Sequence, residues 1–377
     1  MSSLKDKLNQ VSKKGFHVGR PNMPDKAKVL EKISQVFDNQ WLSNMGPLSL
    51  ELEERIAHML GVKHCICVCN ATIGLELLQR ALDLKGEVII PSFTFVATAH
   101  SLRWQRINPV FCDVRNEDHL IDPDKIEALI TPRTTAIMAV PIWGQPCDYE
   151  ALQKIVDKHN LKLIFDSAHA FGCKYHNQYL GGFGDAEVFS FHATKIFSTG
   201  EGGAVTTNND QLAEKLRLMR NFGFSGKDQV SSIGTNAKLC EFNAAYGLVS
   251  LENIQDIIEH NKNLYSEYLE SFSDIVEIDI LKYDPTNSNN HHYLVASVKP
   301  SLRSKILNIG KEHNFFLKRY FYPGVHRHAP YKFDKKYKNL HLEKTDSLCK
   351  RTICFPTGYQ MNSERISNLK TIIKSSL

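Results

Sequence analysis

The sequence predicts an α/β fold in which a mostly parallel sheet is covered by helices on both faces. Two observations lead to this prediction. Short apolar runs alternate with amphipathic segments between about residues 47 and 207, which is typical of parallel sheets joined by helices. The 377 residues include 42% hydrophobic and 23% charged side chains, the balance of an ordinary globular protein. We therefore expect a three-layer domain with a full hydrophobic core.

Seven apolar runs are expected to form the strands of this sheet. They are CICVC (65–69), EVIIP (87–91), NPVFCDV (108–114), TAIMAV (135–140), KLIFD (162–166), EVFSF (187–191) and GGAVTT (202–207). Amphipathic helices are expected at 48–60, 73–84, 123–130 and 149–159. Ligands of such sheets bind beyond the carboxyl ends of the strands, so the residues that follow each run are the functional candidates.

The pattern changes after residue 208. In chain order we expect a helix at 210–220, a Gly/Ser-rich loop at 221–235, a long helix at 240–272, a strand at 292–298 and a helix at 301–313. This change predicts two domains. Residues 1–250 would form the large domain, including an N-terminal arm, and residues 251–377 a smaller α+β domain.

Charge and composition disfavour several classes of partner. The net charge of +5 comes from scattered residues, whereas nucleic-acid binding proteins usually carry a concentrated basic patch. No run approaches the roughly 18 apolar residues of a membrane span, and the first residues do not resemble a secretion signal. We expect a cytoplasmic protein that binds neither nucleic acid nor membrane.

The nine cysteines do not predict a metal site. Cys65, Cys67 and Cys69 alternate, so in a strand they would lie along one face. Chelation usually needs a turn between two ligands and a second pair of them, which is missing here. We interpret these three residues as small buried side chains.

Three strand ends carry residues that could do chemistry. Asp166 ends KLIFD, where a buried carboxylate would need a cationic or hydrogen-bonding partner, although it could simply cap a helix. Lys195 follows EVFSF and precedes the glycine-rich TGEGG, so a desolvated amine could form a Schiff base, although most lysines are exposed and idle. Residues 70–72 follow CICVC, where free amides at a helix start could bind an anion or merely be capped.

Together these three features match what pyridoxal 5'-phosphate requires. That cofactor needs a lysine for its aldehyde, an acid beside its ring nitrogen and anchors for its phosphate. With WLSNMGP (41–47), PSFTFVATAH (91–100) and GTNAKLCEFNAAYGL (234–248), the segments resemble the DegT/StrS-type sugar aminotransferases. That family has the aspartate-aminotransferase fold, type I, of pyridoxal-phosphate enzymes, and the resemblance covers about Trp41 to Tyr331.

The resemblance implies roles for individual residues. Lys195 would bind the cofactor as a Schiff base and move the proton, and Asp166 would pair with the ring nitrogen. His169 would lie near the ring hydroxyl, and Phe95 would stack on the ring, although it could be a core residue. The phosphate would be held by Ala71, Thr72 and Ser190 and, from a neighbouring subunit, by Asn236. The last role implies a homodimer with shared active sites.

Two histidines have weaker implied roles. His192 resembles a histidine that assists proton transfer, and His326 lies in a segment near the active site where it would contact the substrate. Either residue could equally be structural. The family also includes dehydratases in which histidine replaces the lysine, so the presence of Lys195 favours amino transfer.

The resemblance also implies a substrate class, a nucleotide-linked keto sugar with L-glutamate as amino donor. SFHATK followed by EGG is more similar to the members that aminate C4 than to those that aminate C3. We expect conversion of dTDP-4-keto-6-deoxy-D-glucose to dTDP-4-amino-4,6-dideoxy-D-glucose, as in O-antigen biosynthesis. The cofactor would alternate with pyridoxamine 5'-phosphate in ping-pong kinetics. A C3-aminotransferase, a UDP-keto-sugar aminotransferase and an inactive regulatory binding protein remain open alternatives.

Overall fold

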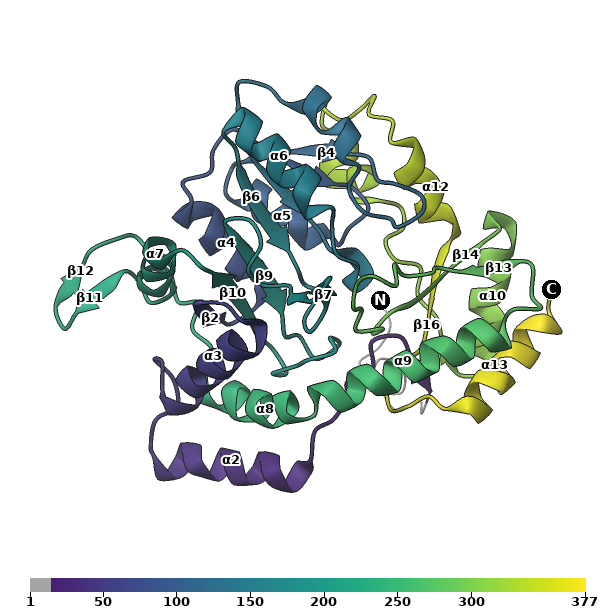
Figure 1. Ribbon diagram of the computed structural model, residues 1–377, viewed down its shortest axis with the longest axis horizontal. Helices are drawn as coiled ribbons and strands as arrows, with labels where there is room; N and C mark the ends of the chain where they lie inside the picture. Colours follow the sequence, from purple (N-terminus) through teal and green to yellow (C-terminus); the bar gives the residue numbers. More distant parts are fainter. Residues whose placement is uncertain (1–14) are drawn as a thin grey trace, which may run out of the picture.

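A seven-stranded sheet forms the centre of the molecule (Figure 1). The computed structural model describes residues 15–377, so part of the expected N-terminal arm lies outside the described residues. The strand order is β2-β10-β9-β6-β5-β3-β4. Their bounds are β2 His64–Val68, β3 Glu87–Pro91, β4 Asn108–Cys112, β5 Thr134–Ala139, β6 Lys162–Asp166, β9 Ala186–Ser190 and β10 Gly203–Thr207. Only β10 runs antiparallel to its neighbours in this sheet, which confirms the mostly parallel α/β fold.

The sheet separates two hydrophobic cores because successive side chains of a strand point to opposite faces. Along β2, Cys65 and Cys67 pack into one core, and Ile66 and Val68 pack into the other. The first core is covered by α3 (Pro47–Leu60) and α6 (Tyr149–His159), and the second by α4 (Ala71–Ala81), α5 (Val96–Trp104) and α7 (Asp210–Arg220). The result is the expected three-layer arrangement. All nine cysteines are free thiols.

Two expected helices differ from the structure. The long helix is divided at Asn253 into α8 (Glu241–Glu252) and α9 (Ile254–Ser271). The side-chain amide of Asn253 reaches back to the Val249 carbonyl at 3.4 Å, and such local bonds compete with helical pairing.

The second difference is at 123–130, where two short 3₁₀ turns replace the expected helix. They are Pro123–Lys125 and Glu127–Leu129. Pro132 disfavours the helical conformation at Thr131, so the segment is not extended into a longer helix.

The C-terminal part of the chain builds a second, smaller sheet in the order β13-β14-β16. Its strands are Ile278–Ile280, Leu294–Val298 and Thr352–Phe355, of which the sequence pattern indicated only the middle one. A third core lies between this sheet and helices α9, α10 (Pro300–Glu312) and α13 (Ser363–Lys374). In Figure 1, α9 runs from the large sheet to this small domain.

The chain returns to the large sheet after the small domain has begun. Val325, Tyr331 and Tyr337 pack into the second core together with residues of β3 and β4. The expected division near residue 250 falls close to the break at Asn253, and it stays a prediction. The returning segment matters for function because it brings C-terminal side chains to the ends of the large-sheet strands.

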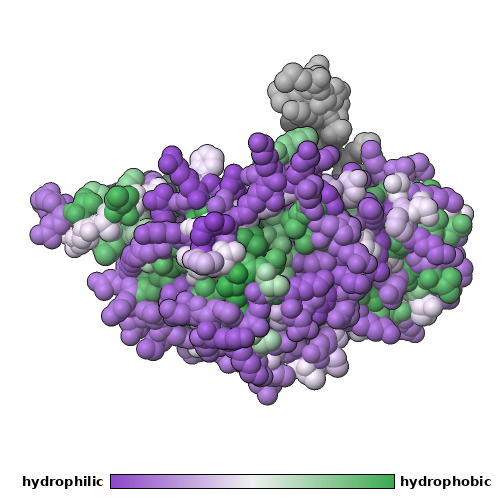
Figure 2. All heavy atoms as spheres, turned by 90° about the horizontal axis from the view of Figure 1, so that it is seen from above, coloured by the Kyte–Doolittle hydropathy of each residue, from purple (hydrophilic) through white to green (hydrophobic). Residues whose placement is uncertain are grey.

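A short hairpin of β11 (Phe224–Gly226) and β12 (Gln229–Val230) projects from the large domain, at the left of Figure 1. Apolar side chains are exposed in the hairpin, including Val230 at 62%, and just after it, where Ile233 is 83% exposed. Figure 2 shows these hydrophobic atoms on the projecting end, while much of the remaining visible surface is hydrophilic. Within residues 15–377, no helix has the length and apolarity needed to cross a membrane.

Candidate active site

A cavity of about 790 Å³ lies beyond the carboxyl ends of the large-sheet strands. Segments from five strand ends meet there, as expected for a parallel sheet. The C-terminal part of the chain closes the other side. The residues that line it include Asn70, Ala71, Thr72, Thr94, Phe95, Asp166, His169, Ser190, His192, Thr194, Lys195, Glu201, Tyr293, Lys318, Tyr320 and Phe321.

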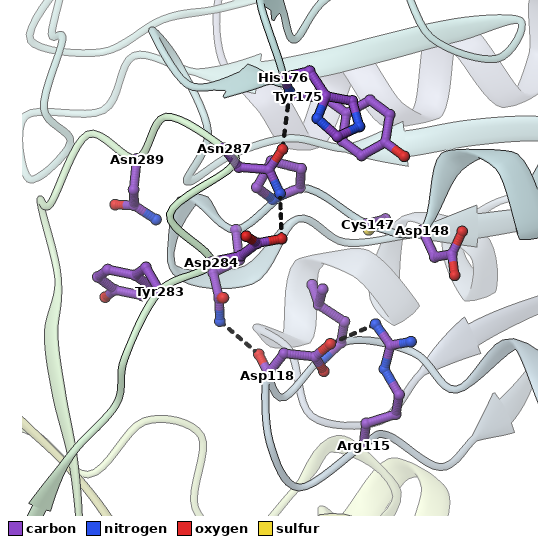
Figure 3. Close-up of a pocket in the computed structure, with 13 residues that line it drawn as sticks. Arg115, Asp118, Cys147, Asp148, Tyr175, His176, Tyr283, Asp284, Asn287 and Asn289 are labelled. Carbon is purple, nitrogen blue, oxygen red and sulfur yellow. Dashed lines mark hydrogen bonds and ion pairs between the residues drawn. The ribbon is translucent and has the colours of Figure 1, made fainter.

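A second cavity, of about 260 Å³, lies between the start of α6 and the loop before β14 (Figure 3). Its carboxylates already have partners. Asp118 pairs with Arg115, Asp148 accepts a 3.0 Å hydrogen bond from an amide of α6, and Asp284 accepts one of 3.1 Å from Asn287. We therefore assign the chemistry to the first cavity.

Asp166 is the buried acid of the first cavity. It ends β6 and is 5% exposed. Its Oδ2 accepts a 2.7 Å hydrogen bond from the hydroxyl of Thr98, and Oδ1 lies 3.4 Å from the Ala168 amide. Burial raises the pKa of Asp166, and the Thr98 bond and the charge of Lys195 oppose this rise. A cationic group bound in the cavity would favour the charged carboxylate.

Lys195 is the buried amine of the same cavity. The loop after β9 carries it, and its backbone amide donates a 2.9 Å hydrogen bond to the His192 carbonyl. Burial lowers the pKa of Lys195 to about 8, although the charge of Asp166 opposes the shift. A useful fraction of the amine is therefore uncharged near neutral pH, as a nucleophile requires.

The start of α4 offers an anion site at the cavity wall. The Asn70 side chain caps the helix by accepting a 2.9 Å hydrogen bond from the Ile73 amide. No partner among the described residues takes up the amides of Ala71 and Thr72, which lie at the positive end of the helix dipole. Glycine at position 203 keeps this place open, because a Cβ there would lie 2.7 Å from the Ala71 nitrogen.

Phe95 and His169 offer groups suited to a planar ring. Phe95 is 57% exposed although it lines a cavity, so the alternative of a core residue does not hold. His169 is 9% exposed, and its Nδ1 accepts a 3.4 Å hydrogen bond from the Trp143 amide. Burial holds the pKa of His169 well below its usual range, so the ring is neutral and its proton lies on Nε2.

Ser190 and His192 also line the cavity. Nδ1 of His192 lies 2.8 Å from the Thr194 hydroxyl, and Nε2 lies 3.5 Å from a carboxylate oxygen of Glu201. The structure does not bring Asn236 to the cavity of its own chain. This residue is exposed beside the projecting hairpin, where its backbone pairs with Asn221.

His326 is not among the residues that line the cavity in this chain, so its expected contact with the substrate stays a prediction. Its side chain is 2% exposed, and its backbone amide donates a 3.1 Å hydrogen bond to the Ser92 hydroxyl. The same hydroxyl lies 2.7 Å from Nδ1, and Nε2 lies 3.2 Å from Asp346. The returning segment thus packs this ring against Ser92, in the loop that carries Phe95.

Sequence reasoning did not find the four cavity residues that come from the C-terminal part of the chain. They are Tyr293, Lys318, Tyr320 and Phe321. The only signal was the position of Tyr293 at the start of the predicted strand 292–298. Their place in the cavity depends on how the small domain folds back, which no local pattern reveals.

Comparisons with known proteins agree with this geometry. Residues 24–374 match the family described as DegT/DnrJ/EryC1/StrS aminotransferases. A dTDP-4-amino-4,6-dideoxy-D-glucose transaminase of Shigella dysenteriae is 35% identical over 364 residues, which cover 96% of this chain and 99% of the relative. A UDP-4-amino-4,6-dideoxy-N-acetyl-beta-L-altrosamine transaminase of Helicobacter pylori is 33% identical, with 92% of each chain covered.

A solved structure is similar over the same extent. The crystal structure of DesI in the presence of its TDP-sugar product has a TM-score of 0.92 and 40% sequence identity. The similarity covers 96% of this chain and 93% of that chain. The likeness therefore extends over both sheets and over the cavity between them.

Proposed function

The chain belongs to the DegT/DnrJ/EryC1/StrS aminotransferase family, and we propose that it aminates C4 of dTDP-4-keto-6-deoxy-D-glucose with L-glutamate as donor. It is a sugar aminotransferase that uses pyridoxal phosphate. The observation that carries the finer proposal is the strand-end cavity in which the amine of Lys195 shares a wall with the carboxylate of Asp166. The Shigella relative and the TDP-sugar named for DesI support the choice of substrate.

The side chains of the cavity fit pyridoxal phosphate. When bound, this cofactor supplies an aldehyde and a ring that withdraws electrons from the reacting carbon. Lys195 would hold the aldehyde carbon and Asp166 the ring nitrogen. The free amides of Ala71 and Thr72 would hold the phosphate, since they lie at a helix start that glycine keeps open.

Three side chains control protons around the ring. Lys195 can both accept and release a proton near neutral pH, because burial lowers its pKa to about 8. Asp166 would stay ionised against a protonated ring nitrogen, since an opposite charge favours the carboxylate. The neutral His169 would donate from Nε2 to an oxygen on the ring. Phe95 would cover one face of the ring and exclude water.

Lys318 is suited to an anionic group of a substrate. Its side chain lines the cavity, and no carboxylate of the described residues forms an ion pair with it. Both proposed substrates are anions, one through a diphosphate and the other through its carboxylates. A lysine here would favour either over neutral sugars.

The proposal includes assembly and location. A homodimer would bring Asn236 of one subunit to the phosphate site of the other. The exposed apolar side chains of the projecting hairpin support this arrangement, because large apolar patches often mark interfaces. Nine free thiols suit the reducing cytoplasm, where the product would enter deoxyamino-sugar biosynthesis for O-antigen-type polysaccharides.

A UDP-linked keto sugar is the second candidate substrate, favoured by the Helicobacter pylori relative. The test offers the purified protein each keto sugar with L-glutamate and measures the 2-oxoglutarate formed. We expect a higher kcat/KM with the dTDP sugar. Preference for the UDP sugar would overturn the choice of nucleotide. No turnover with either keto sugar would overturn both candidate substrates.

A further inference from the structure

The hydroxyl group of Tyr293 lies beside the amine of Lys195. Nζ of Lys195 donates a 3.4 Å hydrogen bond to Oη of Tyr293 and lies 5.9 Å from the centre of its ring. Within the described chain, neither atom forms another hydrogen bond. We propose that Tyr293 is the positioning residue of Lys195, and that its hydroxyl holds the lysine amine in place in both protonation states.

A phenol hydroxyl is suited to this task because it can accept from an ammonium group and donate to a neutral amine. Both forms of Lys195 are present near neutral pH, since burial lowers its pKa to about 8. Burial raises the pKa of Tyr293 well above its usual value, so the phenol keeps its proton throughout this range. A carboxylate such as Asp166 can only accept, and it would serve the charged amine alone.

His169 and His292 are the two histidines whose pKa values respond to the charge of Lys195, and His192, Glu201, Lys318 and Tyr320 also line the cavity. Burial lowers the pKa of His169 and lowers the pKa of His292 to about 4. The charge of Lys195 lowers both values further. Both rings are therefore neutral wherever Lys195 titrates. Burial and the charge of Asp166 set the pKa of Lys195, and the proposal adds the hydroxyl of Tyr293 to them.

The position of Tyr293 is itself fixed by several contacts. Its carbonyl oxygen accepts a 2.6 Å hydrogen bond from the Tyr283 hydroxyl, and its ring centre lies 4.3 Å from that of His169. Nε2 of the preceding residue, His292, lies 2.8 Å from the carbonyl oxygen of Thr194. This hydrogen bond joins the segment that carries Tyr293 to the segment that carries Lys195. A partner fixed in this way costs little further ordering during the reaction.

This inference rests on the proposed function, because it gives Lys195 the tasks of binding the cofactor and moving the proton. A lysine that leaves the cofactor and returns as a base must be held in a defined position between these steps. The hydroxyl oxygen of Tyr293, a residue of the small domain, would hold it there. Tyr293 would thereby make the reaction depend on the contact between the two parts of the chain.

The test compares the wild-type protein with Tyr293→Phe, which keeps the ring and removes the hydroxyl. Two rates are followed from about pH 6 to pH 10. One is the gain of visible absorbance when pyridoxal phosphate is added to the cofactor-free protein. The other is acetylation of Lys195 by acetic anhydride, measured by mass spectrometry.

For the wild type, both rates should rise with pH around a midpoint near 8. In Tyr293→Phe the midpoint should fall, because the ammonium form loses its acceptor and charged hydrogen bonds are the stronger ones. The plateau rate of cofactor addition should fall roughly tenfold, the usual scale for such a bond. The matched control is Tyr268→Phe, whose buried hydroxyl donates to the Pro356 carbonyl at 3.0 Å in the small-domain core. It should lower stability and leave the midpoint unchanged.

If Tyr293→Phe has the same midpoint and the same rates as the wild type, the positioning role is overturned. A shift of equal size in Tyr268→Phe would also overturn it, since the effect would then follow from general loosening of the fold. A wild-type protein that gains no visible absorbance would contradict both the inference and the proposed function. If the wild type binds the cofactor as expected and Tyr293→Phe behaves in the same way, this inference fails and the proposed function stands.

Discussion

The hydroxyl of Thr98 donates a 2.7 Å hydrogen bond to the carboxylate of Asp166. The bond joins the first turns of α5 to the end of β6, and it links the orientation of the acid to the loop that carries Phe95. It also opposes the rise in pKa that burial causes at Asp166. The orientation and the charge state of the Asp166 carboxylate, which would pair with a cationic ring nitrogen, therefore depend on helix α5.

Thr98→Val should weaken binding of pyridoxal phosphate by roughly tenfold, because a hydrogen bond to a charged group contributes roughly 1.5–3 kcal/mol. The variant keeps the shape of the side chain and removes the donor. Absorbance titration with the cofactor measures the affinity. Thr371→Val is the matched control, since its hydroxyl bonds within α13 at the surface. Equal affinities for Thr98→Val and the wild type would show that the bond does not serve the acid.

Lys318→Gln should raise KM for one of the two substrates by roughly three- to fivefold, the scale of a partly exposed ion pair. Its kcat should change little, because the residue binds and does not react. Steady-state kinetics with each substrate varied in turn would identify the anion that it contacts. Lys305→Gln, on the exposed side of α10, serves as the control. Unchanged KM values for both substrates would remove Lys318 from the binding site.

His326→Ala should lower the free energy of unfolding by roughly 2 kcal/mol, because the buried hydroxyl of Ser92 loses its ring partner and keeps only the backbone amide of residue 326. Urea denaturation measures this loss. Ser92→Ala should cost a similar amount, and the double variant should lose less than the sum because the two residues share one interaction. A large rise in KM for the sugar with normal stability would restore the substrate contact expected from sequence.

Stability should fall as the pH is lowered through the range from about 6.5 to about 4. Burial lowers the pKa of His119 to about 3, and that of His292 and His326 to about 4. In this window the unfolded chain binds protons that the folded chain does not, so acid favours unfolding. The loss at pH 5 should be roughly 1–2 kcal/mol for each such histidine. Urea denaturation at pH 7.5 and pH 5 tests it, and equal stabilities would contradict the buried neutral rings.

The large sheet was predictable because its strands are short apolar runs bounded by polar turns. EVIIP and KLIFD begin and end at the same residues in sequence and structure. The two edge strands of the small sheet were missed. Ile278–Ile280 and Thr352–Phe355 are only three and four residues long, and a run of that length is not distinctive in the sequence.

Part of the site followed from the strand ends alone. Asp166, Lys195 and the start of α4 lie in one cavity because the carboxyl ends of neighbouring strands share an edge. Tyr293 and Lys318 could not be found in this way, because they reach the cavity through long-range packing of the small domain. The same packing determines that His326 is buried behind the cavity wall.

The most direct test of the account supplies the protein with pyridoxal phosphate, ¹⁵N-labelled L-glutamate and dTDP-4-keto-6-deoxy-D-glucose, and locates the label in the product by NMR. The account predicts ¹⁵N bonded to C4 of the sugar, and no labelled product from Lys195→Ala. Label on C3, or labelled product from the Lys195 variant, would contradict it.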